Sequence, residues 1–137
     1  MLSILLTIIA FIVIKFIVEF IIDSVAQNKS IKSAGGLKTK YSVLINKIME
    51  SDPRIKIYEE SNLFVIVGIS GIAGSQLLHL SASYGNIAIM MEVKNNPVFG
   101  HYKMEWRFPE DMDQHLMYEQ MIHDIAQKND YLINRYQ

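Results

Sequence analysis

The chain has no cysteine and no strong excess of either charge. It has 137 residues with 0 cysteines, which excludes disulfides and thiolate metal ligands and is typical of a reducing compartment. Its 13 basic and 14 acidic residues give a formal net charge of -1. This balance lacks the basic excess of nucleic-acid-binding proteins, so we expect no nucleic-acid partner.

Charged residues are scarce at the N-terminus. From Leu2 to Ile22 the only charged side chains are Lys15 and Glu19. A helix of that length spans about 30 Å, the thickness of a bilayer's hydrocarbon core, so the sequence predicts a transmembrane anchor over residues 1–23. A cleaved signal peptide is less favoured, because no Lys or Arg precedes the apolar run and the run is too long. A helix lying in the membrane plane is also less favoured, since the polar face is narrow and poor in Lys and Arg.

The polar residues of this segment follow a regular spacing. They are separated by multiples of four residues and form one slowly turning stripe on a helix: Ser3, Thr7, Lys15, Glu19 and Asp23. Lys15 and Glu19 are neighbours on the stripe and can pair. The simplest interpretation is a plain anchor whose charged side chains reach toward the interface. The alternative is a stripe that faces another helix or a wet cavity, which makes Lys15 and Glu19 candidates for assembly within the bilayer.

Acidic residues are absent between Asp23 and Glu50, whereas five lysines lie there: Lys29, Lys32, Lys38, Lys40 and Lys47. The positive-inside rule therefore predicts a single-pass membrane protein with its N-terminus outside and its C-terminal domain in the cytoplasm. Residues 24–37 are interpreted as a basic juxtamembrane connector that ends at Gly35–Gly36. The candidates for contact with membrane lipid are Lys29, Lys32, Lys38 and Lys40. A solvated linker without specific lipid contacts is the favoured alternative.

Residues 38–137 predict one small α+β domain. An amphipathic helix is expected over 39–50 and a second from Pro109 to about 128. Between them, apolar and alternating runs predict an antiparallel meander of about five strands, at 54–58, 63–70, 76–83, 87–93 and 101–108. Both helices are expected to cover one face of the sheet. This order of elements is similar in outline to the helix–meander–helix of secretion-chaperone-like domains, an analogy that no motif accompanies.

One segment allows a different interpretation. No Asp, Glu, Lys or Arg occurs from Ser61 to Met91, and residues 63–80 have the length of a second membrane span. Glycines in the middle of the run, together with Gln76 and His79, favour strand–loop–strand instead.

No recognisable catalytic or metal-binding pattern is present. The glycines at 68, 71 and 74 lack the lysine that a phosphate-binding loop requires, so a hairpin loop is favoured. His115 and His123 are eight residues apart on one predicted helix, whereas paired helical metal ligands are usually four apart. We therefore expect no metal, no cofactor and no enzymatic activity, with an enzyme only the third hypothesis.

Methionines concentrate in the last two strands and the last helix. Met90, Met104, Met117 and Met121 are candidates for a groove that accepts apolar partners, although a soft core is the favoured interpretation. The expected function is a membrane-anchored binding module that recruits or scaffolds a protein partner, or another copy of itself, at the cytoplasmic membrane surface. The alternative is a small hydrophobic-ligand or lipid-binding protein with a cavity under the methionine-rich helix.

Overall fold

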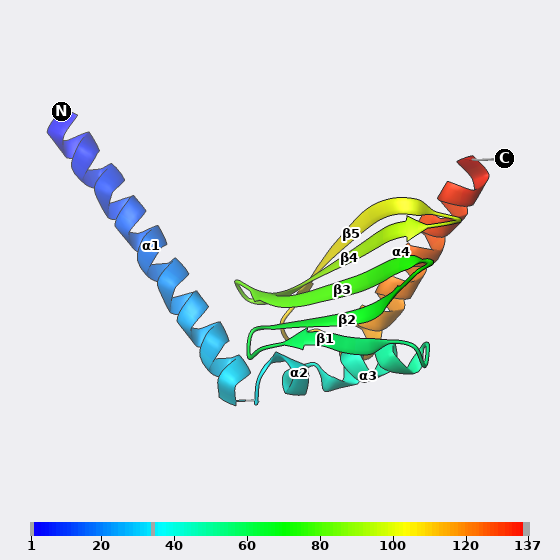
Figure 1. The fold of residues 1–137 in the computed structure, drawn as a ribbon. Helices are drawn as coiled ribbons and strands as arrows, with labels where there is room; N and C mark the ends of the chain where they lie inside the picture. Colours follow the sequence, from blue (N-terminus) through cyan, green and yellow to red (C-terminus); the bar gives the residue numbers. More distant parts are fainter. Residues whose placement is uncertain (1, 34, 136–137) are drawn as a thin grey trace.

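The computed structural model describes the backbone of residues 2–33 and 35–135, and the side chains of these residues except 23–33. Within them the chain forms four helices and five strands (Figure 1). These are α1 (Leu2–Ser33), α2 (Leu37–Lys40), α3 (Ser42–Glu50), β1 (Lys56–Glu60), β2 (Phe64–Gly71), β3 (Gly74–Ser83), β4 (Asn86–Asn96), β5 (Gly100–Pro109) and α4 (Gln114–Arg135). The predicted α+β fold is confirmed.

Helix α1 projects away from the domain (Figure 1). It has 32 residues and is about 48 Å long at 1.5 Å per residue. Every side chain from Leu2 to Ile22 is exposed, so the domain leaves most of this apolar surface uncovered. The helix continues to Ser33 and is followed by Gly35 and Gly36 with φ of 90° and 100°. Only glycine adopts such angles without strain, which explains the predicted stop at this pair.

The five strands form one antiparallel sheet in the order β1-β2-β3-β4-β5, the predicted meander. The register places apolar side chains in continuous rows across one face, because strand residues alternate between faces. One row is Val65, Leu80, Ile89 and Trp106, and the next is Val67, Leu78, Met91 and Met104. Most of these side chains are buried, so this covered face forms the floor of the core.

Helices α3 and α4 cover that face of the sheet and complete the core. From α3, Leu44, Ile45 and Ile48 are buried, and from α4, Met117 and Met121. The first residue of α4, Gln114, joins the two helices. The Leu44 backbone N–H donates to Gln114 Oε1 (2.9 Å), and Gln114 Nε2 donates to the Lys40 carbonyl (2.9 Å). This amide therefore fixes the start of α3 against the start of α4.

Three local expectations are corrected by the structure. The alternative of a second span over 63–80 is wrong, because these residues form the β2–β3 hairpin, with Gly71 paired with Gly74. The single helix expected over 39–50 is broken at Tyr41 into α2 and α3. The last helix begins at Gln114 and not at Pro109, because Pro109 is the end of β5 and pairs with Asn86. The true start is capped by Asp113, whose Oδ1 accepts hydrogen bonds from the two N–H groups of His115 and Leu116.

Gly68 permits a close approach between β2 and β3. A Cβ atom at this position would lie 2.1 Å from the Gln76 carbonyl oxygen, whereas one at Gly71 would meet nothing within 4 Å. We expect Gly68→Ala to lower the free energy of unfolding by about 2 kcal/mol or more, because backbone atoms must shift to make room. Gly71→Ala is the matched control and should change it by less than about 0.5 kcal/mol. Urea unfolding of the full chain in detergent micelles, followed by Trp106 fluorescence, measures both, and equal effects would contradict the expectation.

Candidate functional site

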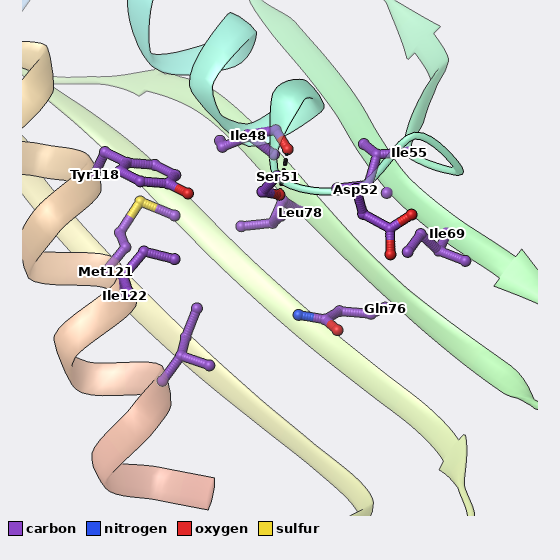
Figure 2. Close-up of a pocket in the computed structure, with 12 residues that line it drawn as sticks. Ile48, Ser51, Asp52, Ile55, Ile69, Gln76, Leu78, Tyr118, Met121 and Ile122 are labelled. Atoms are coloured by element: carbon purple, nitrogen blue, oxygen red, sulfur yellow. Dashed lines mark hydrogen bonds between the residues drawn. The ribbon is translucent and has the colours of Figure 1, made fainter.

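A pocket of about 270 Å³ opens between the end of α3, the middle of α4 and the covered face of the sheet (Figure 2). In Figure 2, Tyr118, Met121 and Ile122 of α4 form one side, and Asp52, Ile55 and Ile69 lie opposite them. Apolar side chains form most of the lining: Ile48, Ile55, Ile69, Leu78, Met121, Ile122 and Ile125.

The pocket results from a difference in length between the covering helices and the strands. Helix α3 has nine residues and is about 14 Å long, whereas β3 has 10 residues and spans about 34 Å. Helix α3 ends at Glu50, and the Ser51 hydroxyl donates to the Ile48 carbonyl (2.6 Å) as the chain turns toward β1. Beyond this point only α4 lies over the sheet, and the strand residues Ile69 and Gln76 line an open hollow.

Three polar side chains of the pocket have partners within the protein. Ser51 donates to a backbone carbonyl, and Gln76 Nε2 donates to Met91 Sδ (3.2 Å). Asp52 pairs with Arg54 (2.7 Å), and the hydrogen bonds from this arginine lower the pKa of the carboxyl to about 2. Because these three side chains are engaged, the surface that remains for a ligand is mostly apolar, with the Tyr118 hydroxyl and the Gln76 carbonyl oxygen as further polar atoms. The pocket therefore suits an apolar group and offers no pair of groups arranged for acid–base or nucleophilic chemistry.

The other face of the sheet is open and mixed in character. The cross-strand row Ile66, His79, Met90 and Glu105 shows the change from apolar side chains on β2 to charged ones on β5. The alternation along β5 places four polar side chains on this face, and all four are exposed: His101, Lys103, Glu105 and Arg107. No three His, Cys, Asp or Glu side chains that could hold a metal ion gather on this face or anywhere else in the described part of the chain.

The two charged residues predicted for assembly lie together on α1. Lys15 Nζ is 3.8 Å from Glu19 Oε1, and the two side chains are 77% and 60% exposed. At the start of the same stripe, Thr7 Oγ1 donates to the Ser3 carbonyl (2.8 Å), so this hydroxyl is satisfied within the helix. Lys15 and Glu19 are thus exposed side chains within reach of each other on one side of the helix. The side chain of Asp23 lies outside the described residues.

The four lysines predicted for the lipid surface are not brought together. The side chains of Lys29 and Lys32 lie outside the described residues. Lys38 is 3.3 Å from Glu60, and Lys40 is 2.6 Å from Glu110 with its side chain only 17% exposed. The last two lysines therefore neutralise acids of the domain, and Lys40 stabilises the junction of the two covering helices.

The four predicted groove methionines are also divided between surfaces. Met121 lines the pocket, Met117 is fully buried in the core, and Met104 packs beside it on the covered face. Met90 lies on the open face, opposite His79 and Glu105. Ile122, next to Met121 on the pocket side of α4, follows the core spacing of this helix in the sequence, which predicts a core residue. In the structure its side chain is exposed and lines the pocket, so its place in a site was not predicted.

No family model, curated protein or solved structure matches this chain. The function has therefore to be inferred from the apolar helix, the pocket and the surfaces between them.

Tyr41 marks the junction of the helices and should make folding sensitive to high pH. Its side chain is 2% exposed and its hydroxyl donates to the Glu110 carbonyl (3.2 Å). Burial, and then the negative charges of Glu110 and Asp111, raise its pKa to about 12 from the ordinary 10. The unfolded chain loses this proton near pH 10 and the folded chain near pH 12, so the stabilisation should be complete below pH 10 and lost as pH rises to 12.

Tyr41→Phe separates this effect from the titration of other tyrosines. The variant should be less stable at neutral pH by about 1 kcal/mol, because it lacks the hydrogen bond. Its free energy of unfolding should fall less steeply between pH 10 and 12 than that of the parent chain. Urea titrations across this pH range measure both slopes, and parallel slopes would show that Tyr41 does not carry the effect.

Proposed function

We propose that this protein is a membrane-tethered binding module whose pocket accepts an apolar side chain of a protein partner at the cytoplasmic membrane surface. The observation that carries the tether is the apolar segment Leu2–Ile22, which is long enough to cross a membrane and is not buried by the domain. An exposed apolar surface of this size requires a cover, and a bilayer supplies one. The orientation, with the domain in the cytoplasm, rests on the excess of lysine over acidic residues after the segment.

The size of the pocket supports a side chain as its occupant. Sites for whole small molecules usually have volumes of about 300–1,000 Å³, and this pocket has about 270 Å³. An anchor side chain that fills a small, dry pocket is the usual centre of a protein–protein interface. The tether would add to the affinity by raising the concentration of the module near membrane partners.

A small apolar ligand is the second candidate, since the lining that would hold a leucine or phenylalanine side chain would also hold a short acyl chain. The two occupants predict different masses. Native mass spectrometry of the full chain released from detergent should show the apo mass if the pocket serves a protein partner, and a constant added lipid mass if it serves a ligand.

The pocket proposal predicts a position-specific crosslink. Ile122 lines the pocket and is 46% exposed, whereas Ile133, on the same helix, is 41% exposed and does not line it. We expect a photo-crosslinking amino acid at 122 to give one defined protein adduct in intact cells, and the same amino acid at 133 to give none. Tandem mass spectrometry of the adduct would identify the partner residue, which should be apolar.

A second variant tests whether the adduct comes from pocket occupancy. Gln76→Trp should fill the open end of the pocket and abolish the crosslink from 122, because Gln76 lines this end from β3 and its side chain is exposed. His101→Trp, on an exposed position of β5 outside the pocket, is the control and should leave the crosslink intact. A crosslink that persists in Gln76→Trp, or that is equal at 122 and 133, would refute the pocket as the binding site.

The charged pair on α1 predicts an effect on assembly. Lys15→Leu with Glu19→Leu should preserve membrane insertion, measured as resistance to carbonate extraction, because both changes increase apolarity. It should weaken association between spans by about 0.5–2 kcal/mol if the pair meets a second helix. Ile14→Leu with Val18→Leu has the same spacing without charge and is the control. Unchanged self-crosslinking in both variants would mean that Lys15 and Glu19 only reach toward the interface.

A further inference from the structure

The turn between β3 and β4 lies against α1, at the end of the sheet nearest that helix (Figure 1). The rings of Phe20 and Tyr84 have centroids 4.7 Å apart and are tilted by 41°. The chain reaches this contact by a detour, because α1 continues to Ser33 and reverses at Gly35–Gly36 before the sheet begins. The chain thus brings this one turn of the domain beside α1, while the rest of the helix projects away (Figure 1).

Neither turn geometry nor core packing explains a tyrosine at position 84. Tyr84 has φ of 43° and the next residue, Gly85, has φ of 79°. A two-residue turn of this kind favours Asn, Asp or Gly, and a bulky residue is strained there. The side chain is 59% exposed, so the core does not bury it. The contact with Phe20 is the main environment that the structure gives to this ring.

The level of Phe20 along α1 fixes the level of Tyr84. Phe20 is two residues before Ile22, the last residue of the apolar segment, which is about 3 Å along a helix. A ring in contact with Phe20 therefore lies at the boundary between hydrocarbon and headgroups when α1 spans a bilayer. Tyrosine is enriched at this boundary, because its ring is apolar and its hydroxyl reaches polar groups.

The residues of the turn itself suit the same environment, and the nearest charge, on Glu110, whose N–H donates to the Gly85 carbonyl (3.0 Å), is paired with Lys40. Residues 81–87 carry no charge, and neither do residues 61–67 of the neighbouring turn and strand. The two turns are joined, since the Ala82 N–H donates to the Leu63 carbonyl (3.3 Å). Leu63 is itself 38% exposed. One end of the sheet therefore presents two adjacent uncharged tips, with Tyr84 and Leu63 on them, beside the membrane helix.

We infer that the β3–β4 turn is a second membrane contact, with Tyr84 and Leu63 seated in the interfacial layer of the bilayer next to α1. This inference rests on the proposed span of α1. In this arrangement both exposed turns, with Tyr84 and Leu63, contact lipid. Two contacts with the membrane would fix the orientation of the domain relative to the bilayer. Gln76 of the pocket is eight residues from Tyr84, about 27 Å along the sheet, so the pocket is held away from the lipid-contacting end.

The absence of cysteine from the chain allows a direct measurement of depth. Single variants Phe16→Cys, Tyr84→Cys and Val98→Cys of the full chain are spin-labelled and reconstituted into phosphatidylcholine vesicles, whose zero net charge removes attraction by lysines. Val98 lies in the β4–β5 turn at the other end of the sheet and is 62% exposed. Power-saturation spectroscopy then compares the accessibility of each label to oxygen and to a water-soluble nickel complex.

We expect the label at 16 to lie deep in hydrocarbon, the label at 84 at the interface, and the label at 98 in water. A label at 84 that the nickel complex reaches as readily as the label at 98, while the label at 16 stays in hydrocarbon, would overturn the second contact and leave the tether intact. A label at 16 that is also in water would overturn both the tether and the contact.

A second variant tests the role of the ring without disturbing the turn. Tyr84→Asn keeps a residue that tolerates positive φ, so the hairpin should fold as before. With the label on Leu63→Cys, this change should shift the label toward water, because the ring that holds the two tips at the interface is lost. Tyr131→Asn removes an equally exposed (59%) tyrosine from α4 and is the control. An unchanged depth at 63 in Tyr84→Asn would overturn the assignment of Tyr84.

Discussion

The side-chain amide of Gln114 is the contact on which the arrangement of the helical layer depends. It accepts from the Leu44 N–H and donates to the Lys40 carbonyl, at the break between α2 and α3. This double contact fixes where α3 begins on the sheet. Since α3 has nine residues, it also fixes where α3 ends, at Glu50. The pocket is the part of the covered face that α3 does not reach. The two hydrogen bonds of Gln114 at the start of α3 therefore determine where the pocket lies beyond the end of this helix.

The surfaces of the protein differ in what they can bind. The pocket is small and mostly apolar, and its Ser51, Asp52 and Gln76 side chains have internal partners. The open face of the sheet changes from apolar to charged across β2 to β5 and presents no concentrated site. At the end of the sheet near α1, the β3–β4 turn has no charged residue and carries an aromatic ring where a turn would favour Asn or Gly, and the neighbouring Glu110 is paired with Lys40. In the proposed arrangement, the pocket would take an apolar side chain and the turn near α1 would meet lipid.

The elements themselves could be predicted from local sequence pattern, as at residues 101–108, where the alternation indicated both the strand and its faces. The start of α4 could not be predicted in this way, because proline followed by acids is typical of a first helical turn. In the structure Pro109 instead ends β5 by pairing with Asn86. The pocket could not be predicted from local pattern either, since it depends on the contact between Gln114 and Leu44, which are 70 residues apart in the chain. Met90 is a different case: alternation alone places it on the opposite face from Met91.

The helical continuation of α1 beyond Ile22 has a mechanical consequence. A flexible linker would let a tethered domain sample many heights and orientations, whereas a helix transmits bending and rotation directly to the domain at its end. Helix α1 and the sheet are held together at two points, the reversal at Gly35–Gly36 and the contact of Phe20 with Tyr84. In the proposed arrangement, the pocket would then stay within a thin layer at constant height above the membrane. Partners would be selected by how far their apolar residue stands from the bilayer as well as by its shape.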